Sequence, residues 1–187
     1  MSNNAKAMKA GIWYTIGNFI ANGMVFLVSP VFNKIMTKGE VGDFSNYSVW
    51  VSLLVIIFTL NLNSALSVAR FDYKDELDDF VGSSLVLGSS FTLFFYILAI
   101  IFSDFITSWV GINKFELHVA FAYFLVSPAL QMFQLKSRIE YKYRAATVVA
   151  FISTTVATLC SVAAIFVFED KFMGRVAGNY IPLILMN

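Results

Sequence analysis

The sequence predicts an all-α integral membrane protein, a polytopic helical bundle with about five full membrane spans and a truncated sixth. Of its 187 residues, 58% are hydrophobic and only 13% are charged. Soluble domains have about 45–50% apolar and about 25% charged residues, so this chain has too little polar surface for a water-soluble fold. The apolar residues also form continuous runs near the roughly 20 residues that cross a bilayer as a helix. Strands of a membrane barrel would instead alternate over about 10 residues.

Charged residues separate six apolar runs, which we interpret as one transmembrane domain covering residues 1–187. The expected spans are residues 10–32, 44–66, 80–102, 117–133, 145–168 and 176–187. The first run is longer than the apolar core of a signal peptide, so we expect it to be retained. The last run would make only about 18 Å of helix at about 1.5 Å per residue. It therefore indicates a chain cut inside a helix, or a short helix that enters the membrane without crossing it.

The basic residues predict the orientation of these spans. Lys and Arg are more numerous on the side of the N-terminus, mainly because of the segment Lys136–Arg144. Cytoplasmic loops carry the excess of basic residues in membrane proteins. The sequence thus predicts a multi-pass protein of the cell (plasma) membrane with a cytoplasmic N-terminus. A net charge of +1 and the apolar composition exclude a nucleic-acid partner.

Polar residues inside the first expected span are candidates for function. Tyr14, Asn18 and Asn22 follow one another at intervals of one helical turn, which places them on one face of a helix. Two asparagines are costly against lipid, so this face should meet protein or water. Two interpretations stay open: hydrogen bonds to a neighbouring helix, or the wall of a water-filled cavity.

A second polar group closes the next expected span at its cytoplasmic end. It contains Asn61, Asn63, Ser64 and Ser67, followed by Arg70. A guanidinium offers several donors in a fixed fork, which suits a phosphate or a carboxylate. The alternative is an arginine that reaches to the interface and only fixes the topology.

The sequence does not favour an enzyme, so no catalytic residue, metal site or cofactor is predicted. His118 is the single histidine and Cys160 the single cysteine, so neither a histidine pair nor a cysteine cluster can hold a metal. The phosphate-binding loop of P-loop nucleoside triphosphatases is absent from the sequence. No pair of carboxylates lies within an expected span.

Four stretches of the N-terminal half carry a family resemblance. They are residues 9–18 (KAGIWYTIGN), 29–37 (SPVFNKIMT), 40–44 (EVGDF) and 64–73 (SALSVARFDY). This pattern resembles polysaccharide-biosynthesis flippases, the O-antigen and lipid-linked-oligosaccharide exporters of the multidrug/oligosaccharidyl-lipid/polysaccharide superfamily. The resemblance implies the first lobe of a two-lobe bundle that moves a glycan on a polyprenyl diphosphate carrier across the membrane by alternating access. Tyr14, Asn18, Asn22, Asn63 and Arg70 would line the substrate pathway.

The resemblance also implies partners and leaves alternatives open. Members have about twice this length, so the expected partners are a missing C-terminal lobe or a second copy, together with membrane lipids. Transport of this kind needs no cofactor. One alternative is a multidrug-type exporter coupled to an ion, which would favour a carboxylate in the middle of a span. Another is a membrane assembly or scaffold protein that transports nothing.

Overall fold

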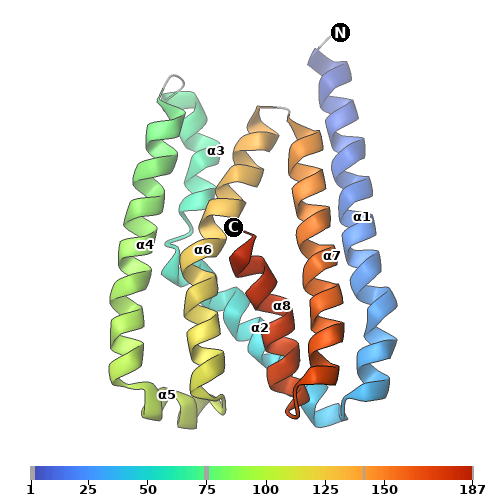
Figure 1. Cartoon of the computed structure of the whole chain (residues 1–187). Helices are drawn as coiled ribbons and strands as arrows, with labels where there is room; N and C mark the ends of the chain where they lie inside the picture. Colours follow the sequence, from blue (N-terminus) through green and yellow to red (C-terminus); the bar gives the residue numbers. More distant parts are fainter. Residues whose placement is uncertain (1–2, 74–75, 141, 187) are drawn as a thin grey trace.

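The chain folds into a bundle of α-helices, most of which run roughly along one axis (Figure 1). The computed structural model describes residues 3–73, 76–140 and 142–186, and some side chains of the first helix lie outside this described set. Within these residues there are eight helices and no strand. They are α1 (Asn3–Ile35), α2 (Lys38–Phe58), α3 (Leu62–Asp72), α4 (Leu77–Ile101), α5 (Ser103–Val110), α6 (Lys114–Ile139), α7 (Tyr143–Val167) and α8 (Lys171–Leu185). The predicted all-α class is confirmed.

The helices form two groups with α8 between them (Figure 1). On one side α1 packs along α7, and on the other α3, α4 and α6 pack together. The start of α1 lies at one end of the bundle, which we call the N-terminal end, together with the end of α3, the start of α4, the end of α6 and the start of α7. The α1–α2 connection, α5 and the α7–α8 connection lie at the other, which we call the α5 end.

Four described helices, α2, α4, α6 and α7, are long and apolar enough to cross a membrane. Their outward surfaces carry large exposed apolar side chains such as Phe94 and Phe166. Side chains of this kind are costly in water but suit a hydrocarbon solvent. In α1 the apolar segment found among the described residues is Phe26–Ile35, which is too short to cross a membrane. A full first span therefore stays a prediction.

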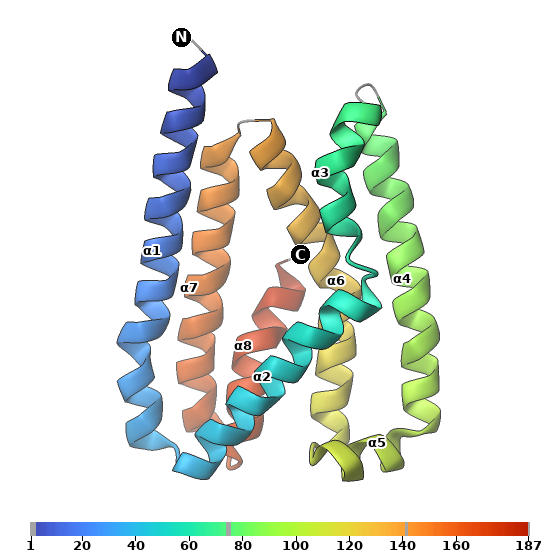
Figure 2. The ribbon, with the colours of Figure 1, turned by 180° about the vertical axis from the view of Figure 1, so that it is seen from behind.

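The second expected span, residues 44–66, differs in the structure. The sequence predicts one continuous helix there, but α2 ends at Phe58 and α3 begins at Leu62. Figure 2 shows α2 running obliquely from the end of α1 to the middle of α4, where α3 turns to follow α4. Together the two helices run once from the α5 end of the bundle to its N-terminal end, and we call this run the α2–α3 crossing (Figure 2).

Polar caps decide where several helices begin. At the start of α2, the Thr37 N–H donates to Glu40 Oε2 over 2.6 Å, and the Glu40 N–H donates to Thr37 Oγ1 over 3.3 Å. The same reciprocal box joins Asn113 and Glu116 at the start of α6. These bonds satisfy amide groups that a helix start leaves unpaired. Because the caps lie outside the apolar runs, α2 and α6 begin before the expected spans 44–66 and 117–133.

The core gathers around α6. Phe121 and Phe124 of this helix pack on Phe58, with ring centroids 5.2 and 5.3 Å away. Tyr47 of α2 contacts Tyr180 of α8 edge to face at 5.7 Å. These aromatic contacts fix α2 against α6 and α8, so the interruption after α2 is held in one place.

Candidate functional site: a polar interruption in the α2–α3 crossing

The interruption consists of two consecutive residues in the left-handed conformation. Leu60 has φ 53° and Asn61 has φ 46°. This conformation costs an ordinary L-residue roughly 1–2 kcal/mol, and asparagine is one of the few that adopts it readily. The Ser64 hydroxyl donates to Asn61 Oδ1 over 3.0 Å, which secures the turn into α3. Two such residues in succession end α2 and change the direction of the chain before α3 begins.

Contacts from α4 hold the interruption half-way along that helix. The Thr92 hydroxyl lies 2.9 Å from both the Phe58 and Gly88 carbonyl oxygens, within hydrogen-bonding distance. Gly88 faces the Thr59 carbonyl, which a side chain at position 88 would approach to 3.6 Å. Thr92 is fully buried, so the end of α2 is anchored on the inner face of α4.

The opposite side of the interruption is open. Leu60 is 40% exposed, and Asn61 is exposed as well. Gly88 is the twelfth residue of α4 (Leu77–Ile101), so this opening lies near the middle of a membrane-length helix. An exposed asparagine and irregular backbone at this depth do not suit lipid, because hydrocarbon cannot bond to them.

A side-chain pair joins the first turn of α3 to α6. The Asn63 amide nitrogen donates to Gln131 Oε1 over 2.5 Å. The side-chain oxygen of Asn63, Oδ1, is buried and has no hydrogen-bond partner among the described residues. One turn before Gln131, the hydroxyl of Ser127 is in the same condition. Unpaired buried acceptors are costly, so these groups are available to bond with water or a polar ligand.

Arg70 occupies the other end of α3. It lies seven residues after Asn63, so both are on one face of the helix, about 10 Å apart along its axis. Its side chain is exposed and its guanidinium lies 4.4 Å from the Phe71 ring centroid. One short helix therefore carries the amide at mid-depth and the cation at the N-terminal end of the bundle.

The three predicted residues of the first span belong to α1. The side chains of Tyr14, Asn18 and Asn22 lie outside the described residues. In the described part of the chain α1 contacts α7 and α2 but not α3. The predicted site residues therefore form two separate groups, one on α1 and one on α3.

Gln131 and Ser127 are the residues that the sequence analysis did not identify. Both lie within the expected span 117–133, where Gln131 is the only amide side chain. The rule that selected Asn18 and Asn63, a polar group within an apolar run, applies equally to Gln131. Its pairing with Asn63 could not be read from the sequence, because 68 positions separate the two residues.

Comparison with known families identifies the family of this chain. The family model described as polysaccharide biosynthesis protein matches residues 7–186. The chain belongs to this family. The match extends well beyond the four N-terminal stretches and confirms the resemblance that they carry. Comparisons with curated proteins and with solved structures found no match.

The family is a transporter-type family rather than an enzyme family. Together with the four helices that can cross a membrane, it supports a multi-pass membrane protein with a role in transport. The polar interruption thus lies in a chain that belongs to a transporter-type family.

Proposed function

We propose that the chain forms one lobe of a flippase that moves a lipid-linked oligosaccharide or polysaccharide precursor across the cytoplasmic membrane by alternating access. The observation that carries this proposal is the interruption of the α2–α3 crossing, which exposes Asn61 in a left-handed turn at mid-depth. Irregular backbone at this depth is tolerated where it meets protein or a water-filled cavity. Interrupted helices near the midplane recur at the binding sites of transporters.

A second lobe completes the cavity in this proposal. Alternating access requires two halves that rock about one binding site. The exposed side of the interruption would face that half, supplied by a C-terminal lobe or by a second copy of this chain. Leu60 and Asn61 would then meet water and protein instead of lipid.

The residues proposed to line the pathway share groups that bond well to sugar hydroxyls. They are Tyr14, Asn18, Asn22 and Asn63, with Gln131 as the partner of the last. Each sugar hydroxyl can both donate and accept hydrogen bonds, and an amide side chain also does both. Arg70 is proposed to bind the diphosphate of the polyprenyl carrier, for which a guanidinium has the matching geometry.

The position of the buried carboxylate Glu116 bears on the alternative of a multidrug-type exporter. Such an exporter would favour an acidic group in the middle of a span to bind Na⁺ or H⁺. Glu116 is fully buried, but it lies in the first turn of α6 at the α5 end of the bundle. One of its oxygens caps that helix by accepting the Asn113 N–H. This placement favours a structural role and leaves the glycan carrier as the preferred cargo.

The test is glycan export in cells that lack this gene and carry defined variants of it. The double variant Asn63→Leu/Gln131→Leu removes both members of the polar pair and keeps the volume apolar. Tyr96→Phe is the control, because it removes a 2.9 Å hydrogen bond to His118 at the α5 end of the bundle. Membrane levels of each protein are measured alongside the lipid-linked glycan and the surface polysaccharide.

We expect the double variant to reach normal membrane levels, to accumulate lipid-linked glycan and to lose surface polysaccharide. Tyr96→Phe should export normally. Normal export by the double variant would contradict the placement of the pathway at α3. Loss of drug resistance without glycan accumulation would favour the multidrug exporter, and no change in either on deleting the gene would favour the scaffold.

A further inference from the structure

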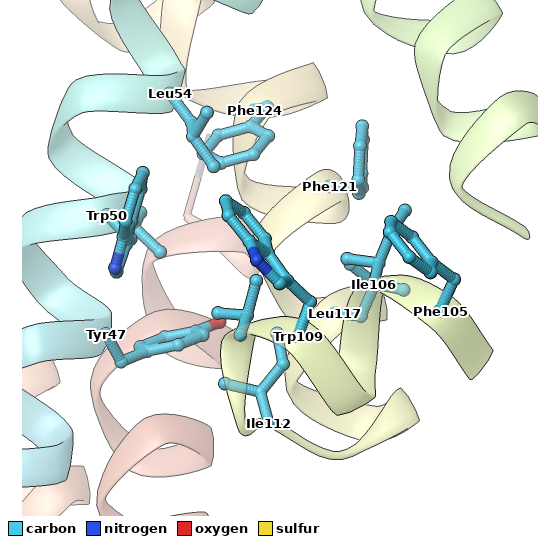
Figure 3. A pocket seen from close by; sticks show the side chains of 13 residues that line it. Tyr47, Trp50, Leu54, Phe105, Ile106, Trp109, Ile112, Leu117, Phe121 and Phe124 are labelled. Atoms are coloured by element: carbon cyan, nitrogen blue, oxygen red, sulfur yellow. The ribbon is translucent and has the colours of Figure 1, made fainter. Parts of the chain in front are cut away.

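An apolar pocket lies at the α5 end of the bundle, away from the polar interruption. Its volume is about 290 Å³, and the atoms that line it are apolar. Side chains from α2 face those from α5 and α6 across it (Figure 3). Trp50 of α2 and Trp109 of α5 both line it, with ring centroids 6.5 Å apart. Ala120 and Phe121 of α6 form part of its inner wall.

This volume is larger than close packing ordinarily leaves. Protein interiors contain few voids bigger than a water molecule, whereas pockets for small ligands begin at about 300 Å³. An apolar void does not hold ordered water. Trp109 is 72% exposed on α5, at the end of membrane-length helices, where interfacial tryptophans are common. The apolar matter available to fill a pocket there is the hydrocarbon chain of a lipid.

A small polar recess adjoins the pocket. It is lined in part by Asp43 and Asn46 of α2 and by Gly111 in the turn before α6, and it shares Tyr47 and Trp50 with the pocket. Asp43 and Asn46 are both exposed. Their spacing with Tyr47 places all three on one face of α2. The combined site is therefore apolar along most of its length and acidic at one end.

In the described part of the chain, Asp43 forms no salt bridge. Lys114, at the start of α6, pairs with Asp104 over 2.7 Å. Lys171 of α8 donates to the Ile35 carbonyl oxygen over 2.8 Å, at the end of α1. Both lysines are thus engaged elsewhere, and the carboxylate of Asp43 favours a cation or a hydrogen-bond donor.

We propose that this site binds a phospholipid with an amine head group, such as phosphatidylethanolamine. One acyl chain occupies the apolar pocket, and the ammonium group lies in the recess beside Asp43. The acidic recess repels a lipid whose head carries only phosphate charge, so the polyprenyl diphosphate cargo is not the occupant. The site is separate from the polar interruption and does not depend on the proposed transport.

Quenching of tryptophan fluorescence tests this directly, because Trp50 and Trp109 border the pocket. The full chain with Trp13→Phe, which removes the third tryptophan, is placed in phosphatidylcholine nanodiscs. Phosphatidylethanolamine or phosphatidylglycerol with the same brominated chains is then added in increasing mole fraction. The quantity measured is the mole fraction at which quenching is half complete.

We expect phosphatidylethanolamine to reach half-quenching at a mole fraction about two- to fivefold lower than phosphatidylglycerol, the range that one exposed ion pair gives. Asp43→Asn should remove this difference, whereas Asp79→Asn at the N-terminal end should keep it. Ala120→Leu fills the pocket and should weaken quenching by both lipids. Ala163→Leu, an exposed change on α7, should have no effect.

Equal mole fractions for the two lipids in the parent chain would overturn the proposal, because the tryptophans would then report only the surrounding bilayer. A preference for phosphatidylglycerol would also overturn it. If Ala120→Leu fails to fold, Val51→Phe fills the same pocket from α2 and provides the same comparison.

Discussion

Replacing Gly178 by alanine should separate α8 from α7, because no space exists for the added methyl group. A Cβ atom at this position would lie 2.5 Å from the Cys160 carbonyl oxygen and 2.5 Å from the Ser161 Cα atom. Both are backbone atoms, which cannot rotate away as a flexible side chain can. Ordinary contacts of a Cβ begin near 3.4 Å, so α8 must shift by about 1 Å. Overpacking of this kind costs about 1–3 kcal/mol.

The matched control is Gly82→Ala on α4. A Cβ at Gly82 meets nothing within 4 Å, and alanine favours a helix over glycine by about 1 kcal/mol. The apparent midpoint of thermal unfolding of the purified chain in detergent should therefore fall for Gly178→Ala and stay level or rise for Gly82→Ala. A shift of about 2–4 °C per kcal/mol is expected for a chain of this size. Equal midpoints for the two variants would refute the close approach of α7 and α8.

Three further changes probe contacts that hold the bundle together. In a double-mutant cycle of unfolding, Asn63→Leu and Gln131→Leu should show a coupling of about 0.6–1.7 kcal/mol, and additive effects would contradict the pair. Thr37→Ala should cost about 0.5–2 kcal/mol by opening the capping box of α2, seen as faster amide exchange in its first turn. Arg175→Met should lower the unfolding midpoint more than Arg70→Met, because the Arg175 guanidinium lies 4.0 Å from two ring centroids and Arg70 is exposed over one.

The helical architecture could be predicted because hydropathy and charge act locally. Apolar runs must form helices in a bilayer to pair their own backbone groups. The expected runs 80–102 and 145–168 lie close to α4 and α7, which begin at Leu77 and Tyr143. The short helix α5 was not expected in the segment after residue 102, because eight residues are too few to carry a clear apolar period.

The interruption after α2 could not be predicted from the same signals. Leu60 is an ordinary helix former inside a continuous apolar run, so neither propensity nor hydropathy marks it. The left-handed turn is held by tertiary contacts, in which Thr92 bonds to the Phe58 carbonyl from a position 34 residues away. Asn61 is the one local hint, because asparagine tolerates this conformation.

Arg175 shows why hydropathy locates the membrane better than it locates the helices. This residue lies in the gap between the expected spans 145–168 and 176–187. In the structure α8 begins at Lys171, because Asp170 accepts the N–H groups of Phe172 and Met173 over 2.9 and 3.1 Å. The helix therefore starts before its apolar run and carries Arg175 into the bundle. There the guanidinium lies 4.0 Å from the ring centroids of Phe32 and Phe44, and cation–π attraction to these rings stabilises it. A charged residue beside an apolar run can thus take part in packing. Here the helix cap at Asp170 decides this, because it sets where α8 begins.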